Sequence, residues 1–172
     1  MGGHGILIAG IGNIFLGDDA FGVEVAQRLA RQKLPDNVRV IDFGIRGLDL
    51  AYALLDGYDA AILVDAMPRG GAPGTLYVVE PECDGPPEAM IEAHALDPAR
   101  VLRLAAAMGE PVRRVLLVGC EPTPLTDADD LSMGLSTAVA AAVEEAIRLI
   151  FSLVDKLRAE TRREEATGAA TQ

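Results

Sequence analysis

The chain has 172 residues, a length that suits one globular domain. Half of the residues are apolar and only 4% are aromatic, so we expect a core of Leu, Ile, Val and Ala. The formal net charge of −11 disfavours nucleic acid and anionic membranes as partners. Two cysteines are too few for a disulfide framework, and we find no signal peptide or membrane-spanning run, which predicts a cytoplasmic protein.

Short apolar runs alternate with segments of helical periodicity along the chain. The predicted strands are, in chain order, residues 6–9, 38–42, 60–64, 75–80 and 115–118. The predicted helices begin near Asp19, cover 47–55, begin again at Asp97-Pro98, and begin for the last time near Ser136. This alternation predicts an α/β fold: one three-layer domain with a five-stranded, mostly parallel, twisted sheet and helices on both faces.

Two parts of the chain depart from the simple alternation. The loop before the 75–80 strand is too short for a crossover helix, which predicts that this strand is antiparallel to its neighbour or lies at an edge. Residues after about Arg162 are polar and small. We therefore expect a single domain over residues 1–162 and a disordered tail over 163–172.

Acidic residues and one histidine occupy or follow the predicted strand ends, where parallel sheets bind their ligands. They are Asp18, Asp19, Asp42, Asp65 and His94. Carboxylates and imidazole suit a divalent first-row metal ion with open coordination positions. Each residue also has a structural interpretation, because the acids can cap a helix or brace a turn and a lone histidine is more often structural. The residue types alone leave both interpretations open.

The turn Gly10-Ile11-Gly12, followed by Asp42 at the end of the next strand, raises nucleotide binding as an alternative. The third glycine of a dinucleotide fingerprint would fall at Phe15, whose ring would block close helix packing. Cys120 at the end of the fifth strand is predicted to be a small buried thiol, and Cys83 carries no signal.

The run from Gly10 to Val23, GIGNIFLGDDAFGV, closely resembles the opening motif of the [NiFe] hydrogenase maturation endopeptidases. The resemblance continues through Leu63-Val64-Asp65-Ala66 and Glu92-Ala93-His94-Ala95-Leu96, and it covers residues 6–150. Two shorter segments match in the expected order, Gly74-Thr75-Leu76 and Gly119-Cys120-Glu121-Pro122. The family's metal ligands fall on Asp19, Asp65 and His94, which the resemblance also implies as catalytic residues.

The resemblance implies an endopeptidase that removes the C-terminal extension of the nickel-loaded precursor of a [NiFe] hydrogenase large subunit. Nickel would come from the substrate, and another divalent ion could replace it in crystals. Its role as a recognition tether or as a Lewis acid stays open. The alternative from another class is a non-catalytic metal- or nucleotide-binding module on a Rossmann-like fold.

One segment departs from the family pattern. The family often has Asp-Gly-Gly-Thr or Asp-Cys-Gly-Thr after the second strand, where this chain has Asp42-Phe43-Gly44-Ile45-Arg46-Gly47. We expect Asp42, Phe43, Gly44 and Arg46 to contact the precursor and to tune which hydrogenase is accepted. A plain connection between strand and helix is the alternative.

Overall fold

The computed structural model describes residues 5–81, 96–124 and 133–169. The strands are β1 (Ile6–Ile11), β2 (Val38–Gly44), β3 (Ala60–Ala66), β4 (Leu76–Val79) and β5 (Arg114–Cys120). The helices are the 3₁₀ helix η1 (Gly17–Ala20), α1 (Phe21–Leu29), α2 (Gly47–Ala53), α3 (Pro98–Met108) and α4 (Thr137–Ala169). The predicted α/β fold is confirmed.

The sheet has the strand order β2-β1-β3-β5-β4. The three pairs β1–β2, β1–β3 and β3–β5 are parallel, and β4 runs antiparallel to β5 at one edge. The prediction of an antiparallel or edge strand is therefore confirmed for β4. Its physical basis is the short β3–β4 loop, which can turn the chain back but cannot carry it across the sheet.

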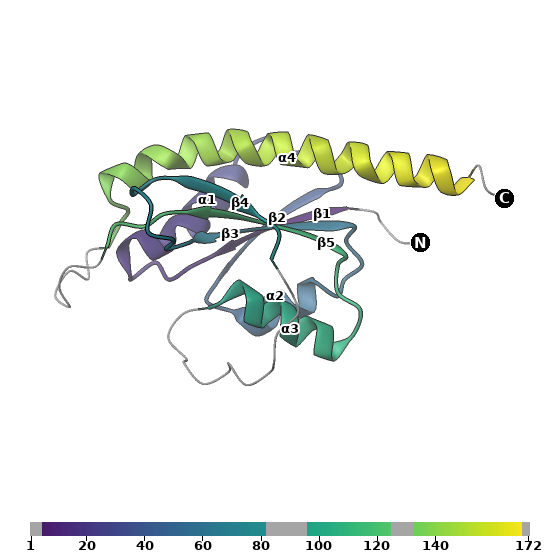
Figure 1. Cartoon of the computed structure of the whole chain (residues 1–172), viewed down its shortest axis with the longest axis horizontal. Coiled ribbons are helices and arrows are strands. Elements are labelled where there is room, and N and C mark those ends of the chain that lie inside the picture. The colour runs from purple at the N-terminus through teal and green to yellow at the C-terminus, as the bar shows by residue number, and fades with distance from the viewer. Residues whose placement is uncertain (1–4, 82–95, 125–132, 170–172) are drawn as a thin grey trace.

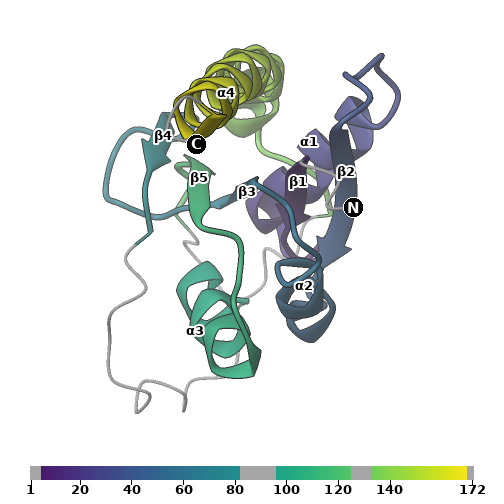
Figure 2. The ribbon, with the colours of Figure 1, turned by 90° about the vertical axis from the view of Figure 1, so that its right-hand side faces the viewer.

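Two helical layers enclose the sheet, as Figures 1 and 2 show: α1 and α4 cover one face, and α2 and α3 cover the other. All six residues of β1 are buried, because alternate side chains enter opposite cores. Ile6 and Ile8 pack in the core beneath α1 and α4, whereas Leu7 and Ala9 pack in the core beneath α2 and α3. A strand buried on both faces accounts for the uninterrupted apolar runs in the sequence.

The helix boundaries differ from prediction in two places. A turn of 3₁₀ helix precedes α1, which begins at Phe21 and not near Asp19. The last helix continues to Ala169, so the prediction of a disordered tail is wrong for residues 163–169. The segment has Arg, Glu and Ala, which favour helix even where no core covers them. Within the described residues, no helix is long and apolar enough to cross a membrane.

Candidate active site

The carboxyl ends of β1 and β3 form the topological switch point of the sheet. The chain leaves β1 to build β2 on one side, and then crosses over to build β3 on the other side. Loops after two such strands diverge and leave a crevice in which α/β proteins bind ligands. Two of the predicted site acids lie here: Asp19 on η1, which follows β1, and Asp65 at the end of β3.

Asp19 is held by the loop that leads from β1 into η1. The Asn13 N–H donates to Oδ2 of Asp19 at 2.8 Å, and the Asn13 side chain accepts from the Phe15 N–H at 3.0 Å. The Asp19 N–H in turn donates to the carbonyl oxygen of Leu16 at 3.1 Å. Among the hydrogen bonds between described residues, the one to the Asp19 carboxylate is to Oδ2 and none is to Oδ1.

Glycines allow η1 and α1 to approach the sheet closely. A Cβ added to Gly12 would lie 1.8 Å from the carbonyl oxygen of Asp19, and Gly12 has a positive φ of 147°. A Cβ on Gly22 would lie 2.0 Å from the carbonyl oxygen of Val64, next to Asp65. Gly22 is thus the close-packing glycine, whereas Phe15 is 61% exposed. The structure gives no support to a dinucleotide fingerprint that needs its third glycine at Phe15.

Asp65 is a buried carboxyl group at the end of β3, where it pairs with Gly119 of β5 and is 8% exposed. Burial, and to a smaller extent the negative charges of Asp19 and Asp97, together raise the pKa of Asp65 to about 8, against the lowering effect of the hydrogen bond from the Ala66 N–H. Among the described residues, no positively charged group lowers the pKa of Asp65. Asp97 thus contributes to the raised pKa of Asp65, and its side chain also caps α3 by accepting from the Ala99 N–H. The sequence indicated only the cap.

Asp18 has a different role from its neighbour Asp19. Its carboxylate accepts from the Ser136 N–H at 2.7 Å, the Ser136 hydroxyl at 2.9 Å and the Thr123 N–H at 2.8 Å. Burial raises the pKa of Asp18, but the hydrogen bonds from Ser136 and Thr123 outweigh burial and hold the pKa below its usual value. Asp18 is thus an ionised crosslink between η1, the segment after β5 and the start of α4.

The loop after β2 is braced by its own polar groups. Asp42 accepts from the Gly44 N–H at 2.9 Å and from Gln27 at 3.2 Å. The Arg46 guanidinium donates to the carbonyl oxygens of Asp42 and Phe43 at 2.5 and 3.2 Å. Phe43 is buried in the core, whereas Ile45 is 63% exposed. The contact of Asp42, Phe43, Gly44 and Arg46 with the precursor stays a prediction, and Ile45 adds an exposed apolar side chain to this loop.

Glu121 is a site-edge residue to which sequence analysis gave no role. Its buried carboxylate accepts from the Arg69 N–H at 2.8 Å, the Gly70 N–H at 3.1 Å and the Tyr77 hydroxyl at 2.8 Å. Burial alone would raise the pKa of Glu121, but these hydrogen bonds lower it below the usual value. Glu121 thereby shapes the β3–β4 loop that follows Asp65. The sequence indicated a role for Glu121 only through its place in the Gly119-Cys120-Glu121-Pro122 segment.

His94, the third predicted ligand, lies outside the described residues, as does Cys83. Among the described side chains, no group of three or more His, Cys, Asp or Glu is placed to hold a metal ion. The nearest described residue after His94 is Leu96, which packs against Gly47 just beyond the end of β2. Leu96 therefore lies near the carboxyl end of β2.

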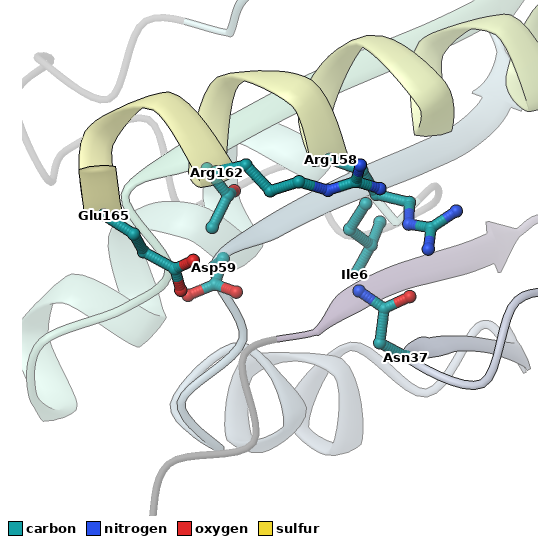
Figure 3. Close-up of a pocket in the computed structure, with 7 residues that line it drawn as sticks. Ile6, Asn37, Asp59, Arg158, Arg162 and Glu165 are labelled. Carbon is teal, nitrogen blue, oxygen red and sulfur yellow. The ribbon is translucent and has the colours of Figure 1, made fainter. Parts of the chain in front are cut away.

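Two surface pockets lie at the amino ends of the strands, opposite the carboxyl ends near which Asp19 and Asp65 lie. One is lined by Ile6, Asn37, Asp59, Arg158, Thr161, Arg162 and Glu165 (Figure 3). Asn37 and Asp59 directly precede β2 and β3, so this pocket lies at the amino ends of the strands. The second pocket shares Asp59 and Thr161 with the first. Neither contains an acid of the candidate site.

Cys120 is fully buried, as predicted. Burial raises the pKa of its thiol to about 11, and the charges of Asp18 and Glu121 act in the same direction. A thiol with this pKa remains protonated at neutral pH, so Cys120 is not an activated nucleophile.

Comparison with known proteins assigns the class. The sequence profile of the hydrogenase maturation proteases matches residues 23–153. A putative hydrogenase maturation protease of Methanocaldococcus jannaschii is 36% identical over 153 residues, which cover 88% of this chain and 97% of that protein. The hydrogenase 2 maturation protease of Escherichia coli is 33% identical over 150 residues, which cover 86% and 88% of the two chains.

Solved structures agree with the sequence comparison. The E. coli hydrogenase maturating endopeptidase HybD superposes with a TM-score of 0.71 at 29% identity, over 88% of this chain and 93% of HybD. A hydrogenase 2 maturation peptidase from a Thaumarchaeota archaeon gives a TM-score of 0.66 at 33% identity, over 88% and 98% of the chains. The protein is therefore a peptide hydrolase. It belongs to the hydrogenase maturation protease family.

Proposed function

We propose that this protein removes the C-terminal extension from the precursor of a [NiFe] hydrogenase large subunit after nickel has been inserted into that subunit. The observation that carries the proposal is the acid pair at the switch point. Asp65 is buried beside the charge of Asp19, and no described hydrogen bond from a basic side chain neutralises either of them. Two neighbouring acids reduce the stability of the metal-free protein, and a bound cation offsets this loss.

The chemistry of the two acids fits nickel carried by the substrate. Asp19 offers Oδ1, Asp65 offers a carboxylate that loses its proton readily when a cation approaches, and His94 is the proposed third ligand. Oxygen and nitrogen donors of this kind suit nickel and leave coordination positions open. Nickel bound there would identify a loaded precursor, and it would also supply Lewis acidity toward a peptide carbonyl or water.

The protein's own groups orient one carboxylate and hold a proton on the other. The Asn13 N–H holds the Asp19 carboxylate in one orientation. In the metal-free protein the Asp65 carboxyl holds a proton, because its pKa is about 8, and this proton would leave when the carboxylate takes a cation. The buried thiol of Cys120 leaves the attack to water rather than to a covalent nucleophile.

We further propose that the loop after β2 contacts the precursor. The hydrogen bonds of Arg46 and the positive φ of 54° at Gly44 fix this loop so that Ile45 projects outward. Phe15 is also exposed, on the β1–η1 loop; this loop is adjacent to the loop after β2, because the Gly12 N–H donates to the Gly44 carbonyl oxygen at 3.0 Å. An exposed apolar pair beside the acids suits an apolar stretch of the partner. The predicted cytoplasmic location stays a prediction.

The decisive experiment mixes the protein with nickel-loaded and nickel-free large-subunit precursor and follows precursor mass. We expect shortening of the loaded precursor alone. Asp19→Ala, Asp65→Ala and His94→Ala should each abolish shortening. Asp56→Asn, an exposed position in the loop between α2 and β3, should not. Shortening of both precursors would contradict the nickel requirement. Binding without shortening of any cognate precursor would contradict the proposed reaction.

A further inference from the structure

The tandem acids Asp18 and Asp19 point to different parts of the molecule. Asp19 accepts from Asn13, six residues earlier in the chain. Asp18 accepts from Ser136 and Thr123, which are 118 and 105 residues away. One acid therefore turns toward the candidate site, and the other binds the body of the protein.

The backbone that carries Asp19 has few local means of holding its position. The 3₁₀ helix η1 has four residues, and its N-cap residue Leu16 makes no side-chain capping hydrogen bond. A helix of this length is marginal by itself. Close packing of Gly12 against the Asp19 carbonyl restrains one side of η1. The side chain of Asp18 restrains the other side.

The contacts of Asp18 form a small connected network. The Thr123 hydroxyl donates to the Ser136 hydroxyl at 3.0 Å, and the Ser136 hydroxyl donates to Oδ2 of Asp18. The Val139 N–H donates to the Ser136 hydroxyl at 3.4 Å, so the network includes the first turn of α4. The positive end of the α4 dipole favours a carboxylate at this point. A charged acceptor bound by three donors has a fixed direction.

We infer that Asp18 is a positioning residue that fixes the Asp19 carboxylate by anchoring η1 to Thr123 and Ser136. Release of the anchor would let η1 rotate, and the Asn13–Asp19 hydrogen bond would be lost before any core contact. The consequence for peptide cleavage rests on the proposed function. The effect on Asp19 itself does not.

The Asn13 N–H provides a direct test, because it reports whether the Asp19 carboxylate is in place. Amide hydrogen exchange by NMR should compare the full-length protein with Asp18→Asn, which keeps the volume but cannot accept from three donors. We expect exchange at Asn13 to be about tenfold faster, while Ile8 in the centre of β1 is unchanged. Asp56→Asn, which removes an exposed carboxylate far from η1, should leave both amides unchanged. Exchange at Asn13 within twofold of the wild type would overturn the inference.

Ser136→Ala removes one of the three donors and keeps the proposal testable if Asp18→Asn does not fold. We expect a smaller increase in Asn13 exchange, and the double variant should be no faster than Asp18→Asn because both changes act on one network. An unchanged Asn13 amide in Ser136→Ala, or strict additivity, would count against the inference.

Precursor cleavage tests whether the position of the Asp19 carboxylate affects activity. Asp18→Asn should lower kcat at least tenfold with little change in KM, since the partner surface is intact and only the Asp19 geometry is disturbed. A variant in which KM rises while kcat is unchanged would contradict a positioning role. If the wild-type protein cleaves no precursor, the proposed function fails, and the Asn13 exchange rates still decide the role of Asp18.

Discussion

The α-carbon of Gly22 faces the carbonyl oxygen of Val64 so closely that an added Cβ would lie 2.0 Å from it. The same Cβ would lie 2.3 Å from the carbonyl oxygen of Ile11. Gly22 thus packs the first turn of α1 against the ends of β1 and β3 at once. This contact sets the distance between η1, which carries Asp19, and the strand that carries Asp65.

Gly22→Ala should therefore disturb the site more than a small substitution elsewhere. The backbone oxygens cannot move aside as a flexible side chain would, so we expect a loss of about 3 kcal/mol in the free energy of unfolding. Urea denaturation measures the loss. Gly168→Ala is the matched control, because nothing lies within 4 Å of its added Cβ and alanine favours the helix. An equal effect of both variants would refute the packing argument.

Stability should fall as pH rises. The pKa of Asp65 is raised from 3.8 in the unfolded chain to about 8 in the folded protein, first by burial and then by the charge of Asp19. Between these values the folded state binds more protons, so the free energy of unfolding decreases with pH by up to about 1.4 kcal/mol per unit. Urea denaturation with a chelator at pH 5, 6.5 and 8 measures the slope. Asp65→Asn should flatten it, and an unchanged slope would show that Asp65 titrates normally.

Divalent metal binding should release a proton. At pH 7 the Asp65 carboxyl is mostly protonated, since its pKa is about 8. A metal ion that takes the carboxylate must displace this proton, and we expect about one proton per ion. Calorimetric titration with Ni²⁺ or Cd²⁺ in two buffers of different ionisation enthalpy gives the number. Asp65→Asn should bind weakly, and binding without proton release would place the ion elsewhere.

Thiol reagents should not inhibit the enzyme through Cys120. Its thiol is fully buried, and burial raises its pKa to about 11, so thiolate is scarce at pH 8. In a Cys83→Ser background, we expect no labelling by iodoacetamide until the protein unfolds. Cys120→Ala should retain precursor cleavage. Rapid labelling or loss of cleavage in a folded Cys120→Ala variant would reopen a nucleophilic role.

The exposed apolar pair at the edge of the site should affect recognition without affecting folding. Ile45 and Phe15 are 63% and 61% exposed, so Ile45→Ser and Phe15→Ser should change the unfolding free energy by less than about 0.5 kcal/mol. We expect KM for the precursor to rise severalfold. Val78→Ser on the edge strand β4, also exposed, is the control. An unchanged KM in both test variants would exclude these residues from the partner surface.

The fold was predictable because its signals are local and strong. Uninterrupted runs such as Ala61-Ile62-Leu63-Val64 indicate strands buried on both faces, and the short β3–β4 loop indicates the antiparallel β4. The last helix was harder to delimit. A solvated helical end such as 163–169 has no apolar periodicity, so pattern analysis assigned it to a tail.

The site was predictable only in part, because tertiary contacts divide the roles of similar residues. The sequence places Asp18 and Asp19 side by side, but only the fold shows that Asp18 binds Ser136 across 118 residues. Glu121 is equally hidden, since its partners Arg69 and Gly70 are backbone donors that any residue could supply. Asp97 was recognised as a helix cap, whereas its electrostatic effect on Asp65 required the structure.

Helix α4 runs back along the sheet toward the amino ends of the strands, so β1 begins and α4 ends on the same side of the molecule (Figure 1). The acids lie at the other end of the strands. A fluorescent protein or affinity tag placed beyond Gly5 or beyond Ala169 would thus join the described part of the molecule at the end of the strands opposite the acids. Tagged enzyme could be used to follow encounter with a bulky folded precursor without obstructing it.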